Sequence, residues 1–178
     1  MEVNKGRGPQ PSPLRAWVWK LYANTGMRRA EGLDLTWAMV GKKDIRILSR
    51  DDDPDEMEQR ASGTSGATKS RNWRFVPLND AAREALDELK QQTYETGMVI
   101  PQVDKNVLSR SFRKDIARAG LVGTLHWLRH TYVSHLVMNG VPLRTVQVLA
   151  GHSSYAVTER YAHLAPGYMH DTASRISL

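Results

Sequence analysis

The sequence predicts an α+β domain that is mainly helical and carries one small sheet. Most of the chain after Pro13 has apolar residues at helical spacing, and three short strand-like segments lie between positions 37 and 76. Gly, Pro, Asn or Asp residues stand at the ends of many of these segments. A chain of 178 residues suits one domain, or one domain and a small appendage, and can bury a proper core.

The first predicted helix follows a Pro- and Gly-rich start, residues 1–13, which we expect to be a flexible linker. Gly26 ends or interrupts this helix, and a short helix at about 29–35 comes next. The residues that recur at helical spacing in the first helix are Leu14, Val18, Leu21 and Tyr22.

Three strands are expected at 37–40, 45–48 and 73–76, with Gly41 at the first turn. An acidic run at 50–56 and a stretch rich in Gly, Ser and Thr up to Thr68 separate the second strand from the third. This composition predicts a long, mobile loop.

The rest of the chain is expected to be helical. Asn79 or Asp80 caps one helix and Asp104 opens another. Three more helices are predicted at 126–138, 142–150 and 154–164, the second with Pro at its first turn and Gly after its end. The residues expected to face the core are Ala81, Ala85, Leu86 and Leu89 in the first of these helices and Val107, Leu108, Phe112 and Ile116 in the next.

Composition narrows the function classes. The formal charge of +6 and the isoelectric point near 9.7 favour an anionic partner. The absence of cysteine excludes disulfides and thiolate metal sites. No apolar run approaches the length of a membrane span, and the start of the chain lacks the apolar core of a signal peptide. A cytoplasmic protein is therefore expected.

Two arginines are candidates for binding a phosphate. Arg129 lies three residues after His126 on a predicted helix, so their side chains share a face. An arginine presents a planar fork of donors that matches two phosphate oxygens and stays charged at any working pH. Arg28 is the second candidate, because it follows the Gly26 break and opens the next helix, and helix N-termini hold phosphates well. Two such forks can stabilise the charge that builds on a five-coordinate phosphorus.

Tyr161 is the candidate nucleophile for attack on such a phosphate. A free tyrosine has a pKa of about 10, so near neutral pH it needs nearby cations or a proton acceptor. His126 can be that acceptor and then the donor in the reverse step. His152 can donate a hydrogen bond to a phosphate oxygen, and a lysine with a lowered pKa can protonate the leaving oxygen.

Four motifs in a fixed order carry a family resemblance. They are Thr-Gly-x-Arg-x-x-Glu at 25–31, a lysine at Lys69 five residues before Arg-x-Val-Pro-Leu at 74–78, His-x-x-Arg-His-Thr at 126–131, and Gly-His-Ser-Ser at 151–154 with Tyr161 nine residues after His152. Each motif alone is weak, but four in this order are specific. From Leu14 to Leu164 the chain resembles the catalytic domain of the tyrosine recombinases, also called phage-type integrases.

The resemblance implies that fold, with a small antiparallel three-stranded sheet, and a reaction without metal, cofactor or ATP. Tyr161 would attack the scissile phosphate of double-stranded DNA, form a 3′-phosphotyrosyl link and free a 5′-hydroxyl. Arg28 and Arg129 would bind the phosphate with support from His152, Lys69 would be the general acid, and His126 an acid or base. A tetramer on paired DNA sites would exchange strands through a Holliday junction, in a bacterium or for a phage. Glu31 would organise the site.

The chain departs from the family pattern at four places. Trp127 stands where family members often have Asp, at a variable position. Gly32 replaces a bulky aliphatic residue, which is expected to loosen local packing. The long insertion before Lys69 keeps Lys42 and Lys43 as alternative lysines near the sheet. Residues 1–13 cannot supply the N-terminal helical domain with which the family clamps DNA. Residues 165–178 form a tail with apolar side chains that is expected to dock on a neighbouring protomer.

Other interpretations stay open beside this one. His130 and His135 are expected to be structural, and Tyr155 and Tyr168 are the nearest rivals of Tyr161. A two-histidine metal pair at 126 and 130 is disfavoured, because the motif lacks the glutamate of zinc proteases and an arginine lies between the histidines. At the level of the protein, the alternatives are a non-cleaving DNA-binding module of the same fold and a topoisomerase that lets one strand swivel.

Overall fold

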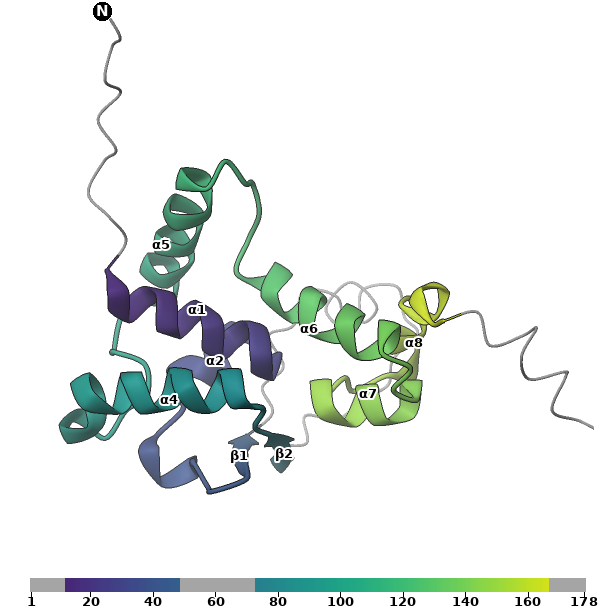
Figure 1. Ribbon diagram of the computed structural model, residues 1–178, viewed down its shortest axis with the longest axis horizontal. Helices are drawn as coiled ribbons and strands as arrows, with labels where there is room; N and C mark the ends of the chain where they lie inside the picture. Colours follow the sequence, from purple (N-terminus) through teal and green to yellow (C-terminus); the bar gives the residue numbers. More distant parts are fainter. Residues whose placement is uncertain (1–11, 49–72, 167–178) are drawn as a thin grey trace, which may run out of the picture.

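The computed structural model describes residues 12–48 and 73–166, and shows a mainly helical fold with a small sheet (Figure 1). Helices α1 (Pro13–Thr25) and α4 (Asp80–Thr93) lie side by side, with the strands next to them. Helix α6 (His126–Met138) packs on α1 and extends towards α7 (Leu143–Ala150) and α8 (Tyr155–Glu159). The predicted fold class is confirmed.

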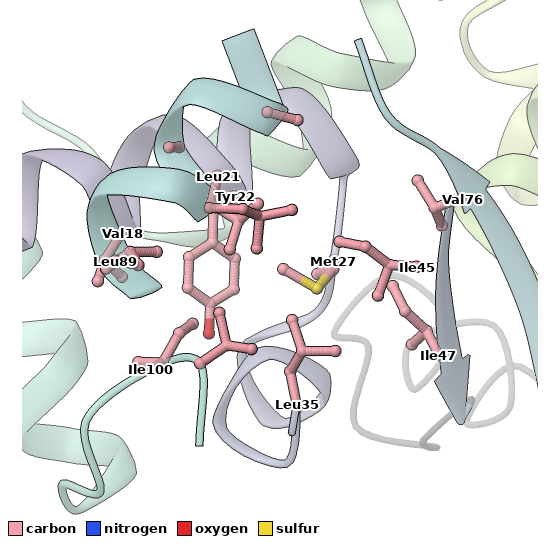
Figure 2. Close-up of a cluster of buried hydrophobic side chains, with 14 of the residues drawn as sticks. Val18, Leu21, Tyr22, Met27, Leu35, Ile45, Ile47, Val76, Leu89 and Ile100 are labelled. Atoms are coloured by element: carbon pink, nitrogen blue, oxygen red, sulfur yellow. The ribbon is translucent and has the colours of Figure 1, made fainter. Parts of the chain in front are cut away.

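The larger hydrophobic core lies between α1, α4 and the sheet. Figure 2 shows Tyr22 in the middle of this core, with Val18 and Leu89 on one side and Met27 on the other. Helix α1 has Pro13 in its first turn and ends at Gly26, whose φ of 60° is left-handed and whose N–H donates to the Tyr22 carbonyl. The predicted helix and its end at Gly26 are therefore confirmed.

Tyr22 corrects the expectation that Gly32 loosens the packing. Gly32 lies in α2 (Arg29–Leu33), directly against the Tyr22 ring, and a Cβ there would come within 2.2 Å of the Tyr22 hydroxyl. That hydroxyl donates a hydrogen bond of 2.9 Å to the carbonyl of Arg29. The volume that a bulky residue at position 32 would take is thus filled from α1, and the core stays closely packed.

The sheet differs from the prediction of three strands. Within the described residues it contains two antiparallel strands, β1 (Asp44–Leu48) and β2 (Trp73–Pro77), with Ile45 opposite Val76. The first predicted strand is the 3₁₀ helix η1 (Trp37–Met39), and only Val40 makes an isolated bridge to Ile45. The N–H of Trp37 donates to the carbonyl of Gly97, just beyond α4 and the short 3₁₀ helix η2 (Tyr94–Thr96). This bond draws the segment away from the sheet.

Two side-chain caps start the helices as their sequences indicated. The Asn79 side chain accepts a bond of 2.8 Å from Ala82 N at the start of α4, and Asp104 accepts one from Asn106 N before α5 (Lys105–Arg118). The buried face of α4 contains the expected Ala85, Leu86 and Leu89, but has Ala82 in place of the half-buried Ala81. In α5, Leu108 and Phe112 are buried, whereas Val107 is exposed.

A second, smaller core holds the C-terminal helices together. Val133 and Val137 of α6 pack there against Val146 and Ala150 of α7, with Tyr161 and Leu164 at the edge. The helix predicted at 154–164 is broken: α8 ends at Glu159, and the 3₁₀ helix η3 (Ala162–Leu164) follows. Tyr161 lies at the break.

The predicted domain boundaries stay a prediction. Helix α1 begins at Pro13, one residue before the expected start of the domain. Most of the predicted linker, the loop up to Thr68, and the tail from position 167 lie outside the described residues. Among the helices that the structure describes, none has the length and apolar character needed to cross a bilayer.

The close approach of Gly32 and Tyr22 predicts a strong coupling between these two positions. Gly32→Ala should lower the free energy of unfolding by about 1–3 kcal/mol, because the new methyl group overlaps the phenol ring. In the double variant Gly32→Ala/Tyr22→Leu, the smaller leucine makes room for the new methyl group. The double variant should therefore lose less free energy of unfolding than the two single variants lose together. Urea unfolding of the four proteins measures this coupling. Additive losses would show that the two residues do not share the space.

Candidate active site

The carboxylate of Glu31 is the centre of a buried ion-pair network. Its two oxygens accept bonds of 2.6 and 2.8 Å from the Arg74 guanidinium, and one of them also accepts a bond of 2.9 Å from Arg28. The other oxygen accepts from the backbone N–H of Arg28 at 2.7 Å, which closes the first turn of α2. Glu31 and Arg28 are 3% and 2% exposed, so solvent does not screen this network.

Three arginines meet at the C-terminal end of α7. Arg74 donates to the carbonyl of Leu149 at 3.1 Å, Arg129 to that of Ala150 at 2.7 Å, and Arg28 to that of Gly151 at 2.7 Å. The last carbonyls of a helix have no partner inside the helix and carry its partial negative charge, so cations stabilise this end. Arg129 also donates to the carbonyl of Gly26, which joins the ends of α1 and α7.

Glycine is required at both of these helix ends. Gly26 and Gly151 have φ values of 60° and 74°, in the left-handed region that favours glycine. A Cβ on Gly151 would lie 2.9 Å from atoms of the Arg74 side chain, and one on Gly26 would lie 2.3 Å from the Tyr132 ring. The two glycines therefore let the arginines and α6 approach the backbone.

The network sets the charge of Glu31. Burial alone would raise the pKa of this carboxyl, but the hydrogen bond and charge of Arg74, with the charges of Arg28 and Arg129, outweigh burial and lower the pKa from 4.5 to about 2. Glu31 is therefore ionised at neutral pH. It partly neutralises three guanidinium groups that would otherwise repel one another.

A pocket of about 280 Å³ opens beside this network. Arg28 and His126 line it together with Arg29 of α2 and Arg113 of α5. The Arg29 guanidinium donates a bond of 3.1 Å to the Ser109 hydroxyl across the pocket. Segments about a hundred residues apart in the sequence thus bring three arginines and a histidine to one pocket, which suits an anionic ligand.

Tyr161 lies against α6, the helix that carries His126 and Arg129. Its ring packs on the second core, and its hydroxyl forms a short hydrogen bond with Nδ1 of His130. The His130 ring in turn stands edge to face with the His126 ring, at 4.5 Å between centroids and 88° between planes. Tyr161 is half-buried, so the second core holds its ring in place.

His152 is fixed from both sides of the α7–α8 turn. Its Nδ1 lies 2.8 Å from the hydroxyl of Thr158, a fully buried residue of α8. The side chain of Gln147 in α7 donates to the His152 carbonyl at 3.2 Å. His152 directly follows Gly151, the residue whose carbonyl binds Arg28.

The structure brings together five of the six residues proposed from the sequence. Arg28 and Arg129 bind neighbouring carbonyls of one helix end, His152 follows these carbonyls, and His126 lines the pocket with Arg28. Tyr161 contacts this group through His130. Lys69 lies outside the described residues. The alternatives Lys42 and Lys43 are exposed before β1, and Lys42 lines a separate pocket with Trp37 and Arg83.

Sequence reasoning missed two residues of the site and a tyrosine that lies beside it. His130 was expected to be structural, yet it contacts the Tyr161 hydroxyl. Arg74 appeared only as part of a motif; alternation along 73–77 places it on the same buried face as Val76, and a charged residue there signals a buried ion pair. Tyr132 lies three residues after Arg129, so it shares that face of α6. Burial raises the pKa of Tyr132, while the charges of Arg74 and Arg129 act to lower it.

The histidine pair at 126 and 130 does not extend to a metal site in the described part of the chain. No group of three or more His, Asp or Glu side chains suited to holding a metal ion occurs there. A two-histidine site would leave most of the coordination sphere to water. The close partner of this pair is a tyrosine hydroxyl.

Comparison with known proteins places this arrangement in a family. Residues 2–167 match the model of the phage integrase family. The chain is 30% identical over 171 residues to tyrosine recombinase XerD of Rhizobium meliloti and 28% identical over 183 residues to the integrase of Salmonella phage P22. The matches cover 89% and 92% of this chain, but 49% and 42% of those proteins, so the chain spans about half the length of these relatives.

Solved structures agree with the fold. The catalytic domain of bacteriophage HP1 integrase is 28% identical, with a TM-score of 0.66 over 93% of this chain and 84% of that one. XerA recombinase, at 22% identity, shares the fold with a TM-score of 0.68 over 93% of this chain and 60% of that one. On the match of nearly its whole length, the chain belongs to the phage integrase family.

Proposed function

We propose that this chain is the catalytic domain of a site-specific DNA recombinase or integrase, with Tyr161 as the nucleophile. The position of Tyr161 carries this proposal. Buried arginines that bind helix carbonyls have a structural use even without a substrate. A half-buried tyrosine whose hydroxyl meets a histidine on the same helix as Arg129 has the arrangement of an oxygen nucleophile beside a proton acceptor.

The reaction begins when a DNA phosphate enters the pocket lined by Arg28 and His126. Arg28 and Arg129, held by the α7 carbonyls, stabilise the negative charge that builds on the phosphorus, and His152 donates to a phosphate oxygen. The Tyr161 oxygen forms a bond to phosphorus while the bond to the 5′-oxygen breaks. Lys69 protonates that leaving oxygen. A 5′-hydroxyl of a partner strand reverses these steps, so the bond energy is kept in the phosphotyrosyl link.

Strand exchange requires several protomers on two DNA sites. A lambda integrase tetramer bound to a Holliday junction shares this fold, with a TM-score of 0.59 and 19% identity over 80% of this chain. XerH, at 21% identity, has been captured on its DNA substrate after cleavage. By this analogy four copies would act together on double-stranded DNA, in the cytoplasm of a bacterium or a phage-infected cell.

Covalent capture tests the nucleophile. Incubated with nicked duplexes taken from the DNA that flanks its coding sequence, without divalent metal, the chain should form an adduct that survives denaturation. Tyr161→Phe should lower this yield at least about 1,000-fold. Tyr132→Phe is the matched control, because Tyr132 is the tyrosine whose pKa responds to Arg74 and Arg129, and it should keep most of the yield.

Peptide mass mapping of the adduct completes that experiment. DNA attached to Tyr132 or another residue would overturn the assignment of Tyr161. DNA binding without any adduct from the wild-type chain would instead favour a non-cleaving binding module.

The ionised Glu31 predicts a pH-dependent stability. The pKa of Glu31 is lower in the folded chain, about 2, than its ordinary 4.5, so its contribution is complete above about pH 4.5 and is lost as the pH falls towards 2. Between pH 6 and pH 3 this group should cost the fold about 2 kcal/mol. Glu31→Gln, which keeps the shape but loses the charge, should be about 3–5 kcal/mol less stable at pH 6.

Urea unfolding at the two pH values measures both effects. The other carboxylates titrate in both proteins, so the difference between wild type and variant isolates Glu31. A carboxyl NMR titration of the wild type gives the same pKa independently. If wild type and Glu31→Gln lost equal stability on acidification, and Glu31 titrated near pH 4.5, the network would not be what keeps Glu31 ionised.

A further inference from the structure

His130 contacts the proposed nucleophile, but the reaction described above assigns it no step. Its Nδ1 lies within hydrogen-bond distance of the Tyr161 hydroxyl, which is the reacting atom of the proposed function. The two rings are 6.1 Å apart between centroids, at 34° to each other. His130 comes from α6 and Tyr161 from the break between α8 and η3, so two separate elements converge on this bond.

His126, in contrast, is oriented towards the phosphate pocket. It lines that pocket with Arg28, whereas His130 lines a different surface pocket with Trp127 and His135. His126 and His130 are four residues apart on α6 and touch edge to face. One histidine is thus next to the phosphate site and the other next to the nucleophile.

We propose that His130 is the general base that takes the proton of Tyr161, a role separate from that of His126; this rests on Tyr161 being the nucleophile. In the neutral imidazole one ring nitrogen carries hydrogen and the other accepts, so His130 holds its proton on Nε2 and accepts the Tyr161 hydrogen at Nδ1. An imidazole is a much weaker base than a phenolate, so the tyrosine proton moves only as the new bond forms.

The step balances as follows. The O–H bond of Tyr161 breaks, its proton passes to Nδ1 of His130, and its electron pair forms the bond to phosphorus. The phosphorus–oxygen bond to the 5′ side breaks, and the 5′-oxygen keeps that pair and takes a proton from the acid of the proposed reaction. In the reverse step His130, now an imidazolium, returns its proton to the departing tyrosine oxygen. His130 therefore ends each cycle neutral.

A substrate with sulfur in place of the bridging 5′-oxygen separates base from acid. A thiolate leaves without a proton, so loss of the acid no longer slows cleavage, whereas loss of the base still does. On this substrate His130→Ala and His130→Asn should both cleave about 100-fold more slowly than wild type. Asn keeps an acceptor near the Nδ1 position but cannot take a proton, so a near-normal rate for this variant would overturn the base role.

Two matched variants on the same helix complete the set. His135→Asn, at an exposed position of α6, should cleave like wild type. His126→Asn should lose about the same factor on both substrates, because Lys69 rather than His126 protonates the leaving oxygen. A different pattern, with His126→Asn slow and His130→Asn fast on the sulfur substrate, would assign the base to His126 and overturn the proposal.

Two readouts distinguish a chemical role from a structural one. The wild-type rate should fall below the pKa of His130, and this limb should vanish in His130→Asn; His126, His135 and Tyr161 are the titratable groups that touch or flank it on α6 and the facing segment. ¹⁵N NMR of the chain without DNA should show Nδ1 as an acceptor whose shift changes in Tyr161→Phe. Hydrogen on Nδ1 of the neutral ring would overturn the assignment.

The same experiment keeps the two proposals apart. If the wild-type chain forms no adduct, the assignment of Tyr161 as nucleophile is overturned, and the proposal for His130 falls with it. A wild-type adduct on Tyr161 with full rates in both His130 variants overturns only the base. Circular dichroism and DNA binding of each variant confirm that the slow proteins are folded.

Discussion

The arrangement of the site depends on one buried carboxylate. Glu31 binds Arg28 from its own helix turn and Arg74 from strand β2, and both arginines continue to carbonyls at the end of α7. Three guanidinium groups crowded at one helix end would repel one another, and the full charge of Glu31 together with the partial charge of the helix offsets that repulsion. Charge therefore joins α2, β2 and α7 at one point, and Arg129 adds α1 and α6 to it.

The site divides into a fixed part and a part that exchanges protons. The arginines and Glu31 are buried and keep their charges throughout the neutral pH range, so the electrostatic field they make is constant. The proposed proton carriers, His126, His130 and Tyr161, are half-buried, and the two histidines lie on α6. A constant field and movable protons are what attack on a phosphodiester requires.

Local signals in the sequence were enough for the helices, because caps and glycine ends act within a few residues. Asn79, Asp104 and Gly151 each stand where such signals place them. The prediction of a third strand is wrong. The apolar segment at 37–40 has the pattern of a strand, but its bond to Gly97 depends on contacts far along the chain. The order of motifs identified the arginines, but not which histidine faces the nucleophile. Which histidine contacts Tyr161 depends on how the segment after α8 crosses α6. A pattern of residues in the sequence does not predict that crossing.

If Arg28 and Arg129 serve both the fold and the proposed cleavage, an evolutionary consequence follows. Each is anchored to helix carbonyls at the centre of the domain, so losing either one exposes unpaired polar groups and weakens the fold itself. Tyr161 is only half-buried, at the edge of the smaller core, so we expect its loss to weaken the fold less. A descendant released from selection for cleavage would therefore lose the tyrosine early and keep the arginines long afterwards. In such a lineage, retained arginines would indicate common ancestry and the same fold. Only a retained tyrosine with its histidine would indicate that cleavage is kept.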